Sequence, residues 1–256
     1  MPIINRCGDT DLPALVLLHG FLGSKEDWQA SLPILSQHFH CICIDLPGHG
    51  ENELILPTPG FETAAKFIVD KVTELGYPRF HLLGYSLGGR MALHIAKFYP
   101  QSLLSLVLES SHLGLTTMKE KQTRLSQDQK WADKLTSEPI GDFLAQWYQQ
   151  AVFAELSLDE RAKLIAIRSK NNPQALLHCY KSTSLGLQEN GQHVLKHLHC
   201  PTYMLVGQQD SKFSQLAQQW QQSAGLTVIT IADSGHNVHK AQPSVFAAKI
   251  IQTLHA

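Results

Sequence analysis

A serine in a glycine-rich turn is the clearest candidate for chemistry in this sequence. Residues 84–88 are Gly-Tyr-Ser-Leu-Gly, which places Ser86 in the pattern GxSxG. An apolar run precedes the pattern and a helix-like segment follows it; in that context the small residues permit a sharp strand-to-helix turn that exposes the serine hydroxyl. The free N–H groups at the start of the helix favour a developing negative charge. We therefore expect Ser86 to act as a nucleophile or a base.

Ser86 needs two partners, because a serine hydroxyl reacts only when a histidine takes its proton and a carboxylate fixes the tautomer of that histidine. Asp210 and His236 each follow a strand-like segment, in the order Ser, Asp, His that suits such a turn. Two alternatives stay open: Asp210 as a helix N-cap and His236 as a surface loop histidine. Asp233 competes as the acid, although turn formation is its commoner role. His49 is a weaker candidate base, because it precedes the serine and follows a different strand.

Two backbone amides are expected to stabilise negative charge on the substrate. The segment His19-Gly20-Phe21 follows an early apolar run, and a loop there can direct the N–H of Phe21 at the reacting oxygen. The N–H of Leu87, next to the serine, is the second expected donor, and such donors lower reaction barriers substantially. Gly20 as a plain chain turn is compatible with this role.

Arginines near the serine suggest an anionic substrate. Arg90 comes four residues after Ser86, one helical turn on, so both side chains can face the same side. A guanidinium binds a carboxylate with two hydrogen bonds. Arg124, Trp147 and Arg168 would line the roof of the pocket if their segment covers the serine. Otherwise, solvated helix surface explains the two arginines and packing explains the tryptophan.

Short apolar runs that alternate with helix-like segments should position these residues. Bounded by turn residues, they predict the buried strands of a mostly parallel sheet, at residues 14–18, 41–44, 80–83, 103–108, 202–206 and 227–231. The expected helices of this part are residues 25–37, 61–75, 87–98 and 243–254. The sequence thus predicts an α/β fold, with the candidate residues in loops at the carboxyl edge of the sheet, where ligands bind.

The alternation stops between about residues 113 and 197, where strand-like runs disappear. Short helices with mixed faces are expected there, at residues 125–135, 139–150, 159–169 and 173–181. We interpret residues 113–197 as a helical cap insertion over one edge of the sheet, and residues 1–112 and 198–256 as the core of the fold.

Composition excludes several other classes of protein. The 256 residues carry 21 basic and 22 acidic side chains, which argues against nucleic-acid binding through a broad basic face. No apolar run approaches the ~18 residues of a membrane span, and the N-terminus lacks the features of a signal peptide. The five cysteines and fourteen histidines show no CxxC, HExxH or other metal-ligand spacing. We expect free thiols in a cytoplasmic protein, with no metal, no cofactor and no membrane insertion.

Nearly the whole chain resembles the α/β-hydrolase superfamily, and within it the 2-succinyl-6-hydroxy-2,4-cyclohexadiene-1-carboxylate synthase family of menaquinone biosynthesis. The stretches shared with many hydrolases are residues 19–23, 45–50 and 84–90. The more specific motifs are residues 136–139, 147–150, 152–153, 164–171 and 210–213, and the resemblance ends with 235–237. It implies an α/β-hydrolase fold, with a mostly parallel sheet flanked by helices and a helical cap insertion.

The resemblance also implies an activity and residue roles. Members of the family are expected to eliminate pyruvate from 2-succinyl-5-enolpyruvyl-6-hydroxy-3-cyclohexene-1-carboxylate, a substrate with several carboxylates. The catalytic roles of the family fall on Ser86, Asp210 and His236. Its substrate contacts fall on Tyr85, Arg90, Arg124, Trp147 and Arg168.

We therefore predict a carbon–oxygen lyase in which Ser86 removes a ring proton as a base, without an acyl-enzyme. We expect a small anionic substrate and a monomer or weak homo-oligomer. A serine carboxylesterase or thioesterase with an acyl-enzyme is the alternative, and a binding protein on the same fold is a third class. The pair Ser110-Ser111 departs from the glycines expected in relatives; we expect it to alter the pocket floor and to touch no triad residue.

Overall fold

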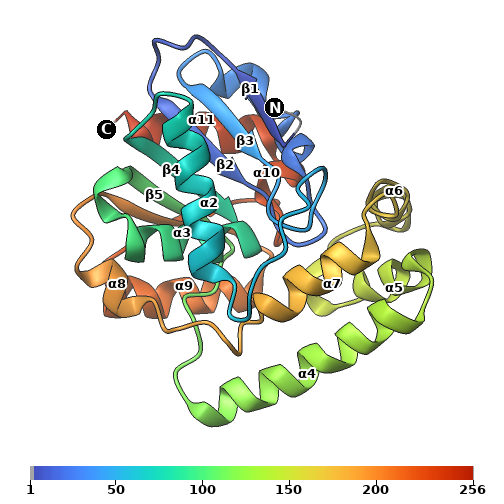
Figure 1. The fold of residues 1–256 in the computed structure, drawn as a ribbon. Coiled ribbons are helices and arrows are strands. Elements are labelled where there is room, and N and C mark those ends of the chain that lie inside the picture. Colours follow the sequence, from blue (N-terminus) through green and yellow to red (C-terminus); the bar gives the residue numbers. More distant parts are fainter. Residues whose placement is uncertain (1–2, 256) are drawn as a thin grey trace.

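A seven-stranded sheet forms the core of the computed structural model, which describes residues 3–255. In chain order its strands are β1 (Ile4–Cys7), β2 (Ala14–Leu18), β3 (His40–Ile44), β4 (Phe80–Tyr85), β5 (Leu103–Glu109), β6 (Thr202–Gly207) and β7 (Thr227–Ile231). They lie side by side in the order β1-β3-β2-β4-β5-β6-β7, and Figure 1 labels the first five strands of this order. β1 runs antiparallel to β3, and the other neighbouring pairs are parallel.

The sequence predicts six of these strands but not β1. Every residue of β2 and β3 is buried, as expected of parallel strands that are covered on both faces and therefore have continuous apolar sequences. β1 is a four-residue edge strand, and Asn5 and Arg6 interrupt its apolar character. Its sequence lacks the signal that marks the other strands.

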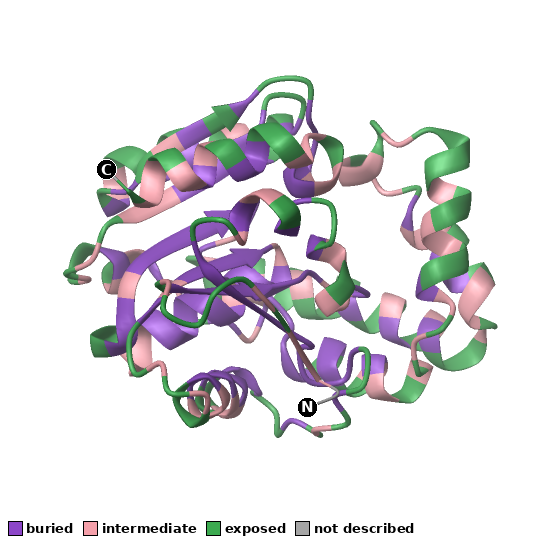
Figure 2. Cartoon of the chain, turned by 90° about the horizontal axis from the view of Figure 1, so that it is seen from above, coloured by how far each residue is buried: buried purple, intermediate pink, exposed green. Residues whose placement is uncertain are grey.

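Helices cover both faces of the sheet, and Figure 2 shows the buried residues concentrated in the strands. One face carries α2 (Phe61–Glu74), α3 (Leu87–Phe98), α8 (Gln192–Lys196) and α9 (Ser211–Ala224). The other carries the 3₁₀ helix η1 (Lys25–Trp28), α1 (Leu32–Leu35), α10 (Val238–Ala241) and α11 (Pro243–Leu254). The helix expected at residues 25–37 is broken in two, because Pro33 lacks an N–H and suits only the first turn of a new helix.

Four helices form a separate layer at one side of the molecule (Figure 1). They are α4 (Met118–Ser137), α5 (Ile140–Trp147), α6 (Leu158–Arg168) and α7 (Pro173–Ser182). α4 packs on α7 and α5 packs on α6. The layer has a small apolar core that includes Phe143, Leu144 and Leu176, and Leu22 from the loop after β2 joins it. That loop therefore attaches the layer to the sheet.

Local signals explain where the elements of segment 113–197 begin. α4 starts at Met118, earlier than the expected residue 125, because Thr117 and Glu120 form a capping box. α8 packs on α3 and α9 instead of on the other helices of the segment. Two more 3₁₀ helices are η2 (Pro100–Ser102) and η3 (Ala151–Phe153).

Within residues 3–255, no helix combines the length and the apolar character needed to cross a membrane.

Candidate active site

Ser86 occupies a strained turn between β4 and α3. Its backbone has φ 50° and ψ −106°, and a non-glycine residue in such a sparsely populated conformation costs about 1–3 kcal/mol. The turn needs small neighbours: a Cβ on Gly84 would collide with the backbone of Gly88, and one on Gly88 with the carbonyl of Leu18. The Ser86 N–H donates to the carbonyl oxygen of Glu109 at 2.9 Å. The serine is thereby fixed to the neighbouring strand.

The structure brings Asp210 and His236 to Ser86. His236 Nδ1 lies 2.7 Å from Oδ2 of Asp210, and His236 Nε2 lies 3.4 Å from Oγ of Ser86. An ionised carboxylate only accepts hydrogen bonds, so Nδ1 carries the hydrogen and Nε2 presents its lone pair to the serine. Asp210 and His236 are both buried. The geometry is that of a nucleophile or base, its proton acceptor and an orienting acid.

Asp210 combines two roles that the sequence leaves as alternatives. While Oδ2 holds His236, Oδ1 accepts the N–H of Phe213 at 3.1 Å and caps α9. Asp233, the competing acid, is exposed and has a φ of 51°, which is typical of a turn residue. Asp210 is therefore the carboxylate that contacts the ring of His236.

Two buried histidines hold the loop after β2. His49 Nε2 accepts the N–H of Leu22 at 3.1 Å, and His19 Nε2 accepts the N–H of Leu46 at 3.0 Å. Burial lowers the pKa of His19 to about 4 and the pKa of His49 to about 3, so both rings are neutral at pH 7. The other ring nitrogen of His49 lies 3.1 Å from the carbonyl of Pro47. His49, the weaker candidate base, thus uses both nitrogens to hold loops.

A cavity of about 100 Å³ lies beside the serine. Ser86, Leu87 and Phe21 line it from the core, and Trp147 and Tyr180 line it from the helical layer. Leu87 is the first residue of α3, so its N–H has no acceptor within the helix. The two residues expected to donate backbone amides therefore border the same cavity as the serine.

Two guanidinium groups line this small cavity. Arg90 donates from Nε to Oε1 of Gln188 at 2.6 Å and from Nη2 to the carbonyl of Thr183. Arg124 donates from Nε to Oδ1 of Asp128 at 2.7 Å. Burial lowers the pKa of Arg90 to about 9 and the charge of Arg124 acts in the same direction, but Arg90 stays protonated at pH 7. The small cavity is therefore suited to an anionic group.

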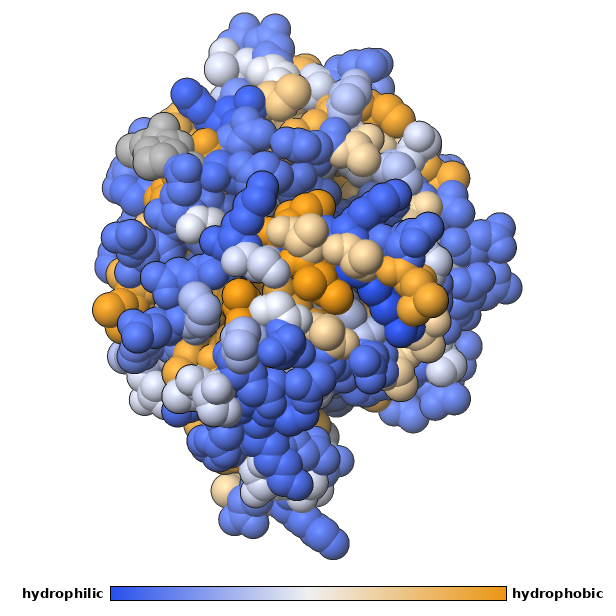
Figure 3. All heavy atoms as spheres, turned by 90° about the vertical axis from the view of Figure 1, so that its right-hand side faces the viewer, coloured by the Kyte–Doolittle hydropathy of each residue, from blue (hydrophilic) through white to orange (hydrophobic). Residues whose placement is uncertain are grey.

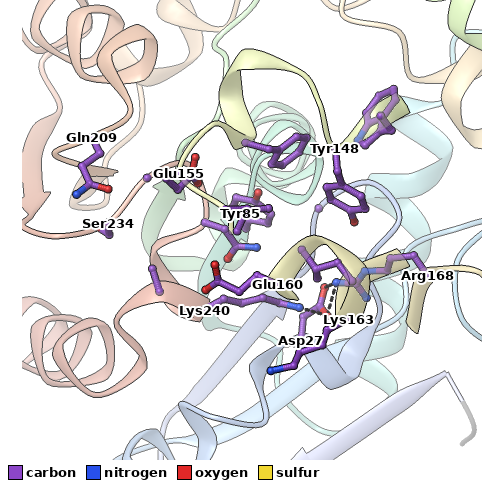
Figure 4. A pocket seen from close by; sticks show the side chains of 18 of the residues that line it. Asp27, Tyr85, Tyr148, Glu155, Glu160, Lys163, Arg168, Gln209, Ser234 and Lys240 are labelled. Atoms are coloured by element: carbon purple, nitrogen blue, oxygen red, sulfur yellow. Dashed lines mark hydrogen bonds and ion pairs between the residues drawn. The ribbon is translucent and has the colours of Figure 1, made fainter. Parts of the chain in front are cut away.

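A larger cavity of about 410 Å³ shares Phe21 and Trp147 with the small one. Figure 4 shows the ion-paired group in it: Arg168 Nη2 lies 2.6 and 2.7 Å from the two carboxylate oxygens of Asp27, and Lys240 Nζ lies 2.8 Å from Oδ1. Burial raises the pKa of Asp27, but the charges of Arg168 and Lys240 outweigh it and hold that pKa well below its usual value.

The expected substrate contacts are thus divided between two cavities. Arg90 and Arg124 border the small cavity with Ser86, whereas Arg168 and Tyr85 border the larger one. The face of the molecule toward the helical layer carries hydrophobic side chains near its centre, among hydrophilic ones (Figure 3). The two cavities together offer cationic groups and aromatic walls.

Comparison with known proteins gives the family. A family model described as alpha/beta hydrolase fold matches residues 13–243. The 2-succinyl-6-hydroxy-2,4-cyclohexadiene-1-carboxylate synthase of Pectobacterium atrosepticum is 38% identical over 239 residues, which are 93% of this chain and 92% of that one. The synthase of Yersinia pseudotuberculosis is 40% identical over 245 residues, which are 94% of this chain and 87% of that one. The chain belongs to the 2-succinyl-6-hydroxy-2,4-cyclohexadiene-1-carboxylate synthase family.

Solved structures agree with this family. The structure of MenH from S. aureus matches with a TM-score of 0.92 and 25% identity, and the match covers 100% of this chain and 98% of that one. A thermophilic esterase from Thermogutta terrifontis has a TM-score of 0.84 over 99% of this chain and 93% of that one, but its 22% identity shows the fold alone. The predicted α/β-hydrolase fold, synthase family and lyase class are confirmed.

This synthase-family member has an acidic site residue that the sequence analysis missed. Asp128 accepts hydrogen bonds from Arg124 at 2.7 Å, from the Tyr180 hydroxyl at 2.7 Å and from Ser184 Oγ at 2.6 Å. Asp128 follows Arg124 by one helical turn, a spacing that pairs charges on a helix. That spacing was a usable signal in the sequence.

Two further contacts to the synthase's histidine and serine were also missed. Glu155, in the loop between η3 and α6, accepts the N–H of His236 at 3.2 Å and so links the helical layer to the histidine loop. Ser111 Oγ donates to the backbone carbonyl of Ser86 at 3.0 Å. The expectation that the pair Ser110-Ser111 touches no triad residue is therefore wrong. Ser111 reaches Ser86 because β5 lies beside β4.

Proposed function

We propose that this chain eliminates pyruvate from 2-succinyl-5-enolpyruvyl-6-hydroxy-3-cyclohexene-1-carboxylate to give 2-succinyl-6-hydroxy-2,4-cyclohexadiene-1-carboxylate. The carrying observation is the hydrogen-bonded row of Ser86, His236 and Asp210 beside a cavity with two guanidinium groups. The 38% and 40% identity to relatives named as this synthase gives the reaction its name.

In the proposed mechanism Ser86 is the base. Asp210 keeps the hydrogen of His236 on Nδ1, so Nε2 accepts the proton of the Ser86 hydroxyl. The serine oxygen then takes a proton from the substrate ring. Positioned proton transfer of this kind contributes roughly 10²–10⁴-fold in rate.

The electrons of the broken C–H bond form the new ring double bond, and the C–O bond to the enolpyruvyl group breaks. The enolate that leaves takes up the proton held by His236 and becomes pyruvate, so no proton is gained or lost overall. Negative charge that develops on a substrate carboxylate faces the N–H groups of Phe21 and Leu87. Fixed donors in a water-poor site supply much of the remaining acceleration.

The cationic groups of the two cavities suit a substrate with several carboxylates. Arg90 and Arg124 bind a carboxylate in the small cavity next to Ser86. In the larger cavity Arg168 and Lys240, which also pair with Asp27, are the cations we assign to a second carboxylate. Glu155, Glu160 and Asp233 line the same cavity, so this contact depends on the local hydrogen bonds of the two cations and not on a net positive charge. This division of the cationic groups between two cavities fits a substrate whose carboxylates are carried by different substituents of the ring.

The aromatic residues complete this substrate site. Phe21 and Trp147 lie between the two cavities and contact the ring of the substrate, while Tyr85 contacts it from the floor of the larger cavity. Their apolar surfaces exclude water from the reacting bonds, which strengthens the electrostatic interactions there.

Residues 113–197 act as a cap insertion on a core of residues 1–112 and 198–256. α4 to α7 supply Arg124, Trp147 and Arg168 to the cavities, and α8 packs back on the core. The proposal includes a monomer or weak homo-oligomer as the working state. The five free cysteines fit work in the reducing cytoplasm.

The direct test is to incubate the purified chain with the enolpyruvyl substrate and to follow pyruvate release. Ser86→Ala is the matched control, because it removes the base and keeps the cavities. We expect release by the wild type and a loss of at least ~10³-fold in Ser86→Ala. A folded wild type that releases no pyruvate contradicts the proposal. If it also hydrolyses a neutral short-chain ester rapidly, the esterase alternative replaces it.

A further inference from the structure

Glu109 holds the turn of the catalytic serine through its backbone. It is the last residue of β5 and pairs in register with Tyr85 at the end of β4. Its carbonyl oxygen accepts the N–H of Ser86 at 2.9 Å. The position of Ser86 relative to the sheet therefore depends on Glu109.

The side chain of Glu109 holds the histidine loop. Its Oε1 accepts the backbone N–H of His239 at 3.0 Å, and Nδ1 of His239 lies 2.9 Å from Oε1 and 2.8 Å from Oε2. His239 follows His236 by three residues and belongs to the short helix α10. One residue thus contacts both the segment that carries Ser86 and the segment that carries His236.

The Glu109–His239 pair is closed off from water. Both side chains have 0% exposure. The His239 ring packs against Trp28, with ring centroids 4.2 Å apart, and against Tyr85, with centroids 5.0 Å apart. Because aromatic rings pack against His239 and the pair is buried, no water molecule can replace the Glu109 carboxylate as the hydrogen-bond acceptor of His239.

A buried carboxylate–imidazole pair of this kind is a poor source of stability. Polar groups are costly to bury even when they are hydrogen-bonded to each other, and apolar residues of similar size often stabilise a fold as well or better. What the Glu109 carboxylate provides and an apolar side chain does not is a fixed acceptor for the N–H of His239. The Glu109–His239 pair is therefore better explained by its fixing the position of the His239 segment than by a contribution to the stability of the fold.

We infer that Glu109 is a positioning residue that sets the distance between Ser86 Oγ and His236 Nε2. The inference rests on the proposed proton transfer between these two atoms. Their separation of 3.4 Å is at the long limit of a hydrogen bond, so a small shift of either segment interrupts the transfer. Glu109 does not replace the triad acid, because Nδ1 of His236 is bonded to Asp210.

The test is the rate at which Ser86 reacts with a fluorophosphonate, since this reaction needs the activated serine and no lyase substrate. Glu109→Gln keeps the length and an oxygen acceptor, whereas Glu109→Met keeps the length and loses the acceptor. We expect Glu109→Gln to stay within about 3-fold of the wild-type rate and Glu109→Met to react roughly 10- to 100-fold more slowly, as expected for a misplacement of up to ~1 Å. If Glu109→Met does not fold, Glu109→Asp replaces it, because its carboxylate ends one methylene short.

Val107→Ala is the control for general loosening. Val107 lies two residues before Glu109 and packs in the core on the same side of β5. Its side chain is apolar, so it makes no hydrogen bond to the segment of Ser86 or to the segment of His236. We expect this variant to lower thermal stability and to keep the wild-type fluorophosphonate rate. With the lyase substrate, Glu109→Met should lower kcat and change KM less than about 2-fold, since no substrate contact is lost.

The inference would be overturned by equal rates in Glu109→Met and wild type, by equal slowing in Val107→Ala, or by a folded wild type that does not react. Equal slowing in Glu109→Gln and Glu109→Met would also contradict it, because it would trace the effect to charge and not to the acceptor. A wild type that reacts with the fluorophosphonate but releases no pyruvate contradicts the proposed function alone.

Discussion

Asp27 and Arg168 join the core of the fold to the helical layer through a buried ion pair. Arg168 Nη2 lies 2.6 and 2.7 Å from the two oxygens of Asp27, and the two side chains are only 6% and 8% exposed. Arg168 also has a buried Nε without a hydrogen-bond partner among the described residues. The pair is therefore a structural link between the two parts of the molecule, and Arg168 also lines the larger cavity.

Arg168→Ala should destabilise the fold as well as reduce activity. Removing one partner of a buried pair costs ~3–5 kcal/mol, and we expect the lower end, about 3 kcal/mol, because Lys240 still pairs with Asp27. Arg124→Ala is the matched comparison: the arginine of its pair is 31% exposed, and the buried Asp128 keeps hydrogen bonds from Tyr180 and Ser184, so we expect a smaller loss of about 1 kcal/mol. Urea unfolding of both variants measures the difference. Equal free energies of unfolding would contradict the structural role of Arg168.

Arg90→Ala and Arg124→Ala should act mainly on catalysis. Each removes a guanidinium from the cavity of Ser86, and a charge-assisted hydrogen bond of ~1.5–3 kcal/mol corresponds to a ~10–100-fold loss in kcat/KM for the anionic substrate. Lys130→Ala, which removes a cation from the exposed surface of α4, is the control and should keep wild-type kinetics. Unchanged kcat/KM in both arginine variants would remove the proposed carboxylate site.

Most of the fold could be predicted because its strands are buried on both faces. Continuous apolar runs such as Ala14–Leu18 mark parallel strands directly, and the final helix starts at Pro243 as its N-terminal signal indicates. β1 could not be found this way. It depends on pairing with β3, some forty residues later in the chain, and its own sequence carries too little apolar character.

The candidate triad could be proposed from order and context, since GxSxG and the strand ends restrict where the acid and base lie. The groups that hold the site in shape could not. Gln188 contacts Arg90 across 98 positions of sequence, and Glu109 contacts His239 across 130. No local pattern records such pairs, because they arise only when separate elements pack together.

Ser111→Gly tests the contact that the sequence analysis did not expect. The variant removes the hydrogen bond from Ser111 Oγ to the carbonyl of Ser86. A net loss of ~0.5–1.5 kcal/mol in the support of the turn predicts a ~2- to 10-fold lower kcat with little change in KM. Ser110→Gly is the control: Ser110 has a φ of 46°, which favours glycine, so we expect higher stability and an unchanged kcat. A wild-type kcat in Ser111→Gly would show that the contact is dispensable.

Buried neutral histidines should make the fold less stable in mild acid. The pKa of His49 is about 3 in the folded chain against 6.5 when unperturbed, and the pKa of His19 is about 4, both because of burial. Below pH 6.5 the unfolded chain therefore binds protons that the folded chain does not. Stability is complete above pH 6.5 and falls as the pH drops toward 4, by about 1.4 kcal/mol per pH unit for each such histidine.

His49→Gln isolates one of these contributions, because the amide oxygen can still accept the N–H of Leu22 that His49 Nε2 accepts in the wild type but does not titrate. We expect the slope of the unfolding free energy against pH, measured with urea at pH 7, 6 and 5, to fall by about 1.4 kcal/mol per unit below pH 6.5. His19→Gln should give a similar reduction down to about pH 4. An unchanged slope in both variants would mean that these rings already take up protons in the folded chain, and that they do not hold the loop as neutral acceptors.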